Sequence, residues 1–127
     1  MGMYTEIIFG ARLVEPLPEE ILGVLQALVK GQPCPGSPEA FPSWIMHGSD
    51  SYYFAGSVKP QLVRDEISGW TLHFRANLKN YRGEIEAFLS WIRPYIGQGA
   101  GDRDLVALVM YESAAVPTMY FLGEGRP

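Results

Sequence analysis

The feature that most constrains the fold is a change of periodicity between Gly69 and Ile96. In the first part of this stretch apolar and polar residues alternate, which is typical of a half-buried β-strand. The apolar side of the alternation carries Trp70, Leu72, Phe74 and Ala76. In the second part apolar residues recur every three or four positions, which is typical of an amphipathic helix. These residues are Ile85, Phe88, Leu89, Ile92 and Ile96. We therefore expect a strand that leads into a helix, and a helix that folds back onto the apolar face of the strand.

The remaining segments predict one more helix and four more strands. Residues 3–14 alternate in the same way, and a helix is expected to begin near Pro18 and to end at Gly31. The other strands are expected at 51–57, 105–112 and 118–122. Whether residues 62–66 continue the second strand or form a loop is left open by the pattern.

The order of the predicted elements is strand, helix, strand, strand, helix, strand and one further strand. This is the split βαβ or ferredoxin-like plan, β-α-β-β-α-β, with an extra C-terminal strand. We therefore predict an α+β fold in which two helices cover one face of an antiparallel sheet. The first and third strands are expected in the centre of this sheet, and the fifth strand beside the fourth.

A chain of 127 residues has the length of one domain and can bury a core without a disulfide or a metal. We interpret residues 1–127 as a single domain that ends in a tail at 123–127. The least regular segment is 32–50, a long Pro-rich loop. Its prolines are Pro33, Pro35, Pro38 and Pro42. A loop of this length inside a compact domain is either functional or an ordered cover over an edge of the core.

Composition excludes several classes of protein. The formal net charge of −4 disfavours a general affinity for nucleic acid or for an anionic membrane. Cys34 is the one cysteine, which excludes an intrachain disulfide and a cysteine-based metal site. No apolar run is long enough to span a bilayer, and the N-terminal residues do not resemble a signal peptide. We therefore expect a cytoplasmic protein that uses no membrane, no metal and no cofactor.

The sheet face opposite the helices needs a cover or a partner. Residues 105–110 are apolar on both sides of their predicted strand, and extended exposed apolar surface is a common sign of an interface. We therefore predict a homodimer, or a larger homo-oligomer, that forms through this face. The alternative is that the Pro-rich loop wraps the face.

The same face is expected to carry a group of ionisable residues. His73 and Arg75 project from a central strand, beside Glu6 and Arg12 of its neighbour. Arginine can clamp a carboxylate or a phosphate, and histidine can transfer a proton. We therefore predict a candidate site for a small anionic ligand, with His73 as acid or base and with Arg75, Arg12, Tyr52 and Glu6 as ligand-binding residues. The alternative is that these residues form ion pairs on the sheet.

The second histidine, His47, is followed by Asp50 and Tyr52. A histidine and an aspartate three positions apart can serve acid–base chemistry or supply half of a metal site. A metal site needs three or four ligands, and nothing in the sequence brings His47 close to His73. We therefore keep His47 as a second candidate catalytic residue and predict no metal site.

Basic residues are concentrated between Lys59 and Arg82. A ferredoxin-like sheet can bind single-stranded RNA by stacking bases on aromatic side chains of its two central strands. The corresponding residues here are Phe9 and Phe74, and the alternation points both toward the helices. Nucleic-acid binding is therefore the weakest functional interpretation.

No group of residues in the sequence matches a known catalytic constellation, so the biochemical activity stays unknown. The first interpretation is a small oligomeric interaction protein that uses the open face of its sheet. The second is a cofactor-independent enzyme that acts on a small anionic molecule in a pocket between this face and the 32–50 loop. The first interpretation predicts a flat face covered by another chain, whereas the second predicts a concave pocket where His73 and Arg75 converge with loop residues.

Overall fold

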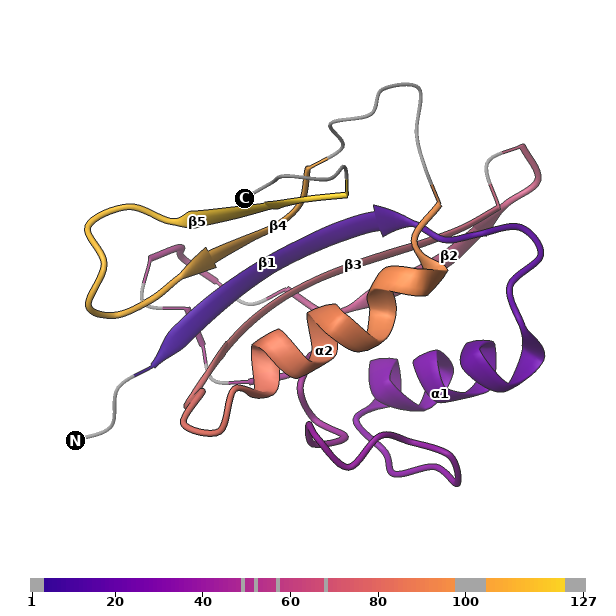
Figure 1. Cartoon of the computed structure of the whole chain (residues 1–127), viewed down its shortest axis with the longest axis horizontal. Helices are drawn as coiled ribbons and strands as arrows, with labels where there is room; N and C mark the ends of the chain where they lie inside the picture. Colours follow the sequence, from indigo (N-terminus) through magenta and orange to yellow (C-terminus); the bar gives the residue numbers. More distant parts are fainter. Residues whose placement is uncertain are drawn as a thin grey trace.

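The structure is a computed structural model, and it describes residues 4–48, 50–51, 53–56, 58–67, 69–97 and 105–122. Within these ranges the chain forms a five-stranded antiparallel sheet and two α-helices (Figure 1). The elements are β1 (Thr5–Arg12), α1 (Glu19–Lys30), β2 (Gln61–Asp65), β3 (Gly69–Leu78), α2 (Glu84–Ile92), the 3-10 helix η1 (Arg93–Tyr95), β4 (Leu105–Met110) and β5 (Thr118–Phe121). The predicted α+β class is confirmed, and the predicted tail at 123–127 lies outside the described residues.

Strand β1 lies at the centre of the sheet. The strand order is β2-β3-β1-β4-β5, and each neighbouring pair is antiparallel. The first and third strands are therefore neighbours, and the fifth lies beside the fourth. Both helices lie on one side of the sheet (Figure 1), and we call the opposite side the outer face. No helix in the described part of the chain is long and apolar enough to cross a membrane.

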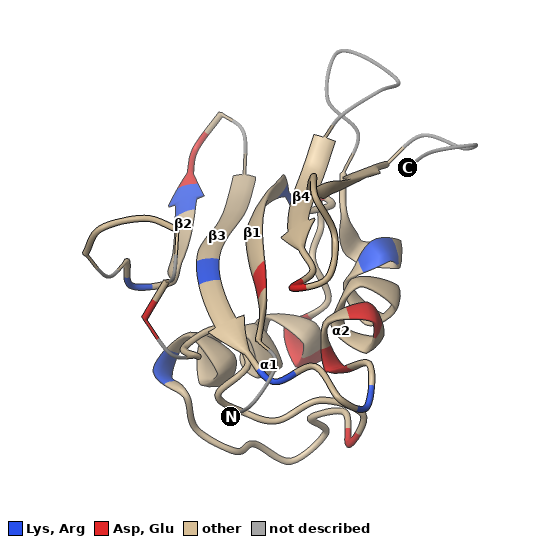
Figure 2. Cartoon of the chain, turned by 90° about the vertical axis from the view of Figure 1, so that its left-hand side faces the viewer, with Lys and Arg blue, Asp and Glu red and all other residues tan. Residues whose placement is uncertain are grey.

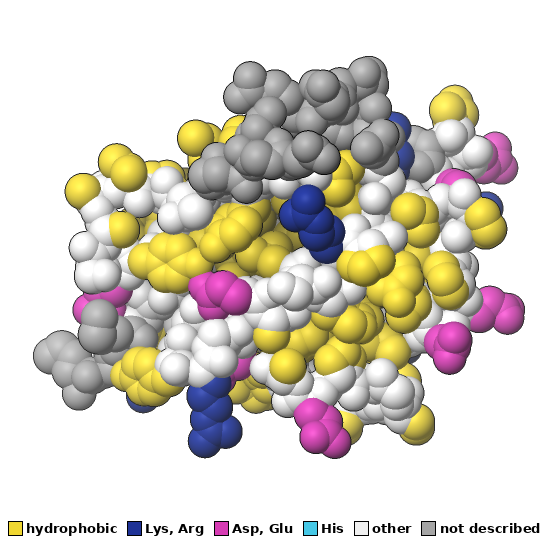
Figure 3. Space-filling view, viewed as in Figure 1, with side chains coloured by type: hydrophobic (Ala, Val, Ile, Leu, Met, Phe, Trp, Pro, Cys, Tyr) yellow, Lys and Arg dark blue, Asp and Glu magenta, His cyan; other side chains and the backbone are white. Residues whose placement is uncertain are grey.

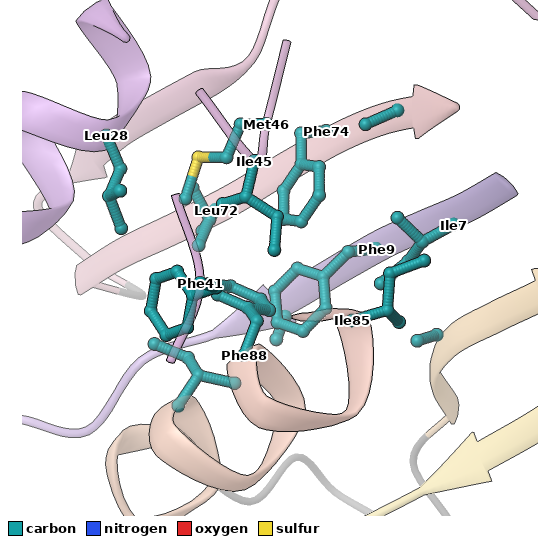
Figure 4. Close-up of a cluster of buried hydrophobic side chains, with 14 of the residues drawn as sticks. Ile7, Phe9, Leu28, Phe41, Ile45, Met46, Leu72, Phe74, Ile85 and Phe88 are labelled. Atoms are coloured by element: carbon teal, nitrogen blue, oxygen red, sulfur yellow. The ribbon is translucent and has the colours of Figure 1, made fainter. Parts of the chain in front are cut away.

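The core between the helices and the sheet is built around aromatic side chains. The ring of Phe88 on α2 makes edge contacts with Phe9 and Phe74, whose own rings stack at 5.4 Å (Figure 4). Phe41 from the Pro-rich loop packs against Phe88 at 5.5 Å, and Ile45 is also fully buried. Part of the Pro-rich loop is thus an ordered cover on the helix side of the sheet.

The apolar spacing of α2 extends beyond the helix itself. The helix ends at Ile92, and a single 3-10 turn that contains Pro94 follows it. Ile96 is extended and pairs with Leu13 in an isolated bridge beyond the end of β1. Ile96 therefore belongs to the same core as α2 although it is not part of the helix.

The second strand is not where the sequence pattern placed it. Residues 51–57 were expected to be extended, but residues 53–56 form bends, and β2 begins at Gln61. The cause is local, because the Ser51 hydroxyl accepts hydrogen bonds from the backbone N–H groups of Tyr53 and Phe54. This bonding turns the chain and competes with strand pairing.

The segment that was expected to be a strand instead crosses the outer face. We call the described residues of this segment and its two flanking positions (50–51, 53–56 and 58) the strap. The chain reaches the outer face by passing the edge of β3 at Gly48. A Cβ atom on Gly48 would lie 2.4 Å from the backbone oxygen of Asn77. The crossing therefore requires glycine because no side chain fits between the two backbones.

We predict that Gly48→Ala destabilises the fold by about 1–3 kcal/mol, since the added methyl group must displace backbone of a central strand. The matched control is Gly23→Ala within α1, where a Cβ atom would meet nothing within 4 Å. Removing a mid-helix glycine should raise stability by about 0.5–1 kcal/mol. Denaturant unfolding measures both changes, and a Gly48→Ala variant as stable as the original chain would contradict the close crossing.

Candidate functional site

The outer face is organised by the pairing of β1 with β3. This register places Glu6 opposite Asn77, Ile8 opposite Arg75, and Gly10 opposite His73. The acidic position on β1 and the basic position on β3 lie side by side (Figure 2). Arg12 pairs with Thr71 at the other end of β1 and is exposed. Glu6, His73 and Arg75 therefore lie on the same face of the sheet, and of the two basic positions Arg75 lies beside Glu6.

Glu6 is the most buried ionisable residue of this group. Its side chain is fully buried, and its Oε2 atom accepts a hydrogen bond of 2.7 Å from the Ser51 hydroxyl. The same oxygen lies 3.9 Å from Nε of Arg75. The strap and β3 therefore both contribute a polar partner to one buried carboxylate, as a buried charge requires.

Arg75 is held between the sheet and the strap. Its Nη2 group donates a 2.9 Å hydrogen bond to the backbone oxygen of Gly56, and its guanidinium lies over the ring of Phe54 at 5.1 Å. Together with the nearby Glu6 carboxylate, these contacts hold the guanidinium in one place. Arg75 is thus a positioned cation rather than a freely moving surface charge.

Asn77 is the third polar residue beneath the strap. Its Nδ2 group donates to the backbone oxygen of Asp50 at 3.1 Å. Its Oδ1 atom is buried and has no hydrogen-bond partner among the described residues, and the same holds for Oε1 of Glu6. A buried oxygen without a donor is a feature that points to function, because most buried polar atoms in proteins are paired.

A cavity of about 330 Å³ lies between the strap, the start of β2 and the outer face. We call it the face cavity. Its lining residues are Ile8, Phe9, Phe54, Val58, Lys59, Gln61, His73, Phe74 and Arg75. Lys59 and His73 are exposed, whereas Arg75 is partly buried. The cavity therefore combines basic side chains at its rim with apolar walls.

The position of His73 depends on the glycine opposite it. A Cβ atom at Gly10 would lie 2.8 Å from Nδ1 of His73, so the imidazole ring lies directly over the glycine. The pairing of β1 with β3 is regular at Gly10 and at the residues on either side of it. The glycine thus serves a close approach rather than a bulge, and it leaves the ring at the wall of the face cavity.

His47 lies in a different place from His73. Its Nε2 atom is 2.8 Å from the backbone oxygen of Val29, in the last turn of α1. It lines a second cavity of about 380 Å³, which we call the edge cavity, at the edge of β3 beyond the end of β2. The edge cavity is lined by Tyr4, Trp44, His47, Gly48, Asn77, Leu78 and Lys79. Among the described residues, no lining residue is common to the two cavities.

The structure thus brings together some of the predicted site residues and separates others. His73 and Arg75 converge with the loop residues Phe54, Val58 and Lys59, whereas Arg12 lines neither cavity. Tyr52 lies outside the described residues. The contribution of Lys59 was missed, since its only signal was its place in the basic stretch. The described part of the chain holds no group of three or more His, Cys, Asp or Glu side chains suited to a metal ion.

A polar cluster that the sequence pattern did not indicate connects α2 with β4 and β5. Glu86 on α2 accepts a hydrogen bond from the Tyr111 hydroxyl and another from Nδ2 of Asn80. The Tyr111 hydroxyl also lies 2.9 Å from that of Tyr120. Burial, reinforced by the bond to Glu86, raises the pKa of Tyr111 well above its ordinary value. This cluster joins α2 to the C-terminal part of the sheet, and it lies outside both cavities.

No family model, curated protein or solved structure matches this chain. The chemistry of the candidate site therefore rests on its own geometry, in which the two cavities carry the features of a ligand site. Ligand sites are concave and mostly apolar, with a few placed polar groups.

We predict that Ser51→Ala destabilises the fold by about 1–3 kcal/mol, because the buried Glu6 carboxylate and two backbone N–H groups lose one hydroxyl partner. Amide hydrogen exchange at Tyr53 and Phe54 should accelerate in the variant. Ser90→Ala on the exposed side of α2 is the control and should change neither quantity. Unchanged exchange at Tyr53 and Phe54 would mean that the serine does not hold the strap.

The Tyr111 cluster predicts a specific dependence on pH. A pKa raised by folding stabilises the native state below the ordinary tyrosine pKa of about 10, and this stabilisation is lost as the pH rises above it. The original chain should therefore lose more stability between neutral and strongly alkaline pH than Tyr111→Phe does. Tyr53→Phe, which changes an exposed tyrosine, should keep the original pH profile; identical profiles for all three proteins would refute the assignment.

Proposed function

We propose that the protein binds a small amphipathic monoanion, such as a carboxylate with an apolar body, in the face cavity. The observation that carries this proposal is the convergence of Lys59, His73 and Arg75 around a concave apolar surface. The cavity volume of about 330 Å³ lies at the lower end of the range that small-molecule sites occupy. This volume favours a compact ligand.

The balance of charge favours one negative charge on the ligand. Arg75 and Lys59 are the permanent cations of the face cavity, and the buried Glu6 carboxylate beside Arg75 offsets part of the positive potential. A polyphosphate would leave several charges without partners in this setting, whereas one carboxylate can accept hydrogen bonds from Lys59 and His73. Arg75 keeps its bond to the strap and adds a fixed positive field.

The apolar walls account for the other end of the ligand. Phe54 and Val58 on the strap are 44% and 52% exposed, and Ile8 forms part of the floor. Covering such surface contributes about 25 cal/mol per Å² of apolar area. A hydrocarbon or aromatic body therefore gains affinity here that a purely polar anion lacks. His73 can also act as an acid or base on a ligand held in this cavity, which is the form that a cofactor-independent reaction would take.

We predict that hexanoate binds the face cavity and that hexylamine, which has the same chain and the opposite charge, does not. Chemical shifts of residues around Phe54, Val58 and His73 should move on titration. Lys59→Gln should weaken the binding about tenfold, which corresponds to the loss of about 1.4 kcal/mol. Lys30→Gln at the end of α1 is the control and should bind as the original chain does. Equal affinity for the amine, or shifts that avoid this cavity, would refute the proposal.

The observation that favours a second function, self-association, is an apolar strip on the outer face beside the face cavity. Leu105 and Met119 are 45% and 46% exposed. Leu108 pairs with Met119 on one side and with Ile8 on the other, and Leu105 lines a shallow hollow together with Ile8 and Leu108. On the helix side, by contrast, hydrophobic surface is interspersed with scattered acidic side chains (Figure 3). Self-association through β4 and β5 would cover the strip and leave the face cavity, on the β3 half of the sheet, accessible.

We predict that the chain sediments as a dimer at micromolar concentration, with twice the chain mass of 14.1 kDa. Met119→Glu should yield monomers, because two carboxylates would be buried across the symmetry axis of the interface. Ile67→Glu in the exposed turn before β3 is the matched control and should leave the dimer intact. A monomer at every concentration would eliminate this candidate.

We also infer that the fold belongs to the split βαβ or ferredoxin-like class, extended by β5. The order of elements and the insertion of β3 between β1 and β2 support this inference. A crystal structure in which β4 does not pair with β1 would contradict this inference.

A further inference from the structure

We infer that the edge cavity is a second binding site, separate from the face cavity, for a small aromatic carboxylate that carries an O–H or N–H donor on its ring. This inference does not depend on the proposed function, because the two cavities share no lining residue among those described. Three features support it: the walls of the edge cavity, one buried acceptor atom and one cation at its mouth.

The walls favour a planar apolar body. Tyr4 precedes β1, and Trp44 belongs to the Pro-rich loop, so the two rings come from distant parts of the sequence. Trp44 is 49% exposed, although neighbouring Ile45 and Met46 are fully buried. Aromatic rings prefer to stack or to meet edge to face with other rings. An aromatic ligand in this cavity would therefore cover indole surface of Trp44 that is otherwise exposed to solvent.

The buried acceptor is the side-chain oxygen of Asn77. This residue is 1% exposed, and its Nδ2 group is already bonded to the backbone oxygen of Asp50. Its Oδ1 atom has no partner within the described part of the chain, and Asn77 lines the edge cavity. A hydroxyl or N–H group on the ligand would give this oxygen the donor that a buried acceptor requires.

The cation is Lys79 at the mouth of the cavity. Its side chain is exposed, and Nζ lies over the ring of Tyr4 at 5.8 Å. A carboxylate on the ligand can therefore meet this ammonium while its ring lies against the aromatic walls. One acceptor, the Asn77 oxygen, and one cation, Lys79, therefore match an acid that also carries a donor.

The topology explains why a cavity exists at this place. Strand β2 pairs with β3 only as far as Gln61 opposite His73, so no strand in the described part of the chain lies beside the last residues of β3 on that edge. The chain crosses this edge at Gly48, in contact with the backbone of Asn77. The space beside the crossing is lined by Trp44 and His47 of the Pro-rich loop and by Tyr4.

The test is an NMR titration of the full chain with 4-hydroxybenzoate, followed through the indole N–H signals of its tryptophans. The Trp44 signal, assigned from the Trp44→Phe variant, should move, while that of Trp91, which is partly buried against the core, should not. Benzoate, which lacks the ring donor, should bind about tenfold more weakly, and 4-hydroxybenzamide, which lacks the charge, should also bind more weakly. Lys79→Gln should lower the affinity for 4-hydroxybenzoate about tenfold without a change in the thermal unfolding temperature.

Lys59→Gln is the matched variant in the face cavity, and it should leave the Trp44 titration unchanged. A titration that is lost in Lys59→Gln and kept in Lys79→Gln would overturn the inference and assign the aromatic acid to the face cavity. Equal affinities for 4-hydroxybenzoate and benzoate would overturn the role of Asn77. A Trp44 signal that does not move at millimolar 4-hydroxybenzoate would overturn the second site altogether.

Discussion

The hydrogen bond between Ser51 and the buried carboxylate of Glu6 is the interaction on which the outer face depends. A fully buried carboxylate is unfavourable unless donors and a countercharge surround it. Ser51 supplies a donor from the strap, and Arg75 supplies the countercharge from β3. Because Arg75 also binds the strap at Gly56, the same network that satisfies the carboxylate fixes the wall of the face cavity.

The parts of the fold that could be predicted are those in which burial imposes a period. The alternation along β3 correctly separated Phe74, which packs in the core, from His73 and Arg75 on the outer face. The second strand could not be predicted, because the apolar run around Phe54 resembles a strand while the turn is set by a single serine hydroxyl. Turn formation by a side chain leaves no periodic signal.

The candidate site could be predicted only in part for a related reason. His73 and Arg75 share one strand, so their proximity follows from spacing alone. Lys59 joins them through the path of the strap, and His47 is held apart because the chain crosses the edge of β3 at Gly48. Asn77 was missed because its importance lies in an oxygen that has no hydrogen-bond partner among the described residues, and this depends on the three-dimensional surroundings.

The most direct test of the account is to locate a bound amphipathic anion relative to the strap. Intermolecular nuclear Overhauser effects between the methyl group of hexanoate and the protein would do so. We predict contacts to the ring of Phe54 and to the methyl groups of Val58, which line the face cavity beside Arg75. Contacts confined to Trp44 and Leu78, or no contacts to the outer face, would contradict the claim that the strap and the sheet together form the binding site.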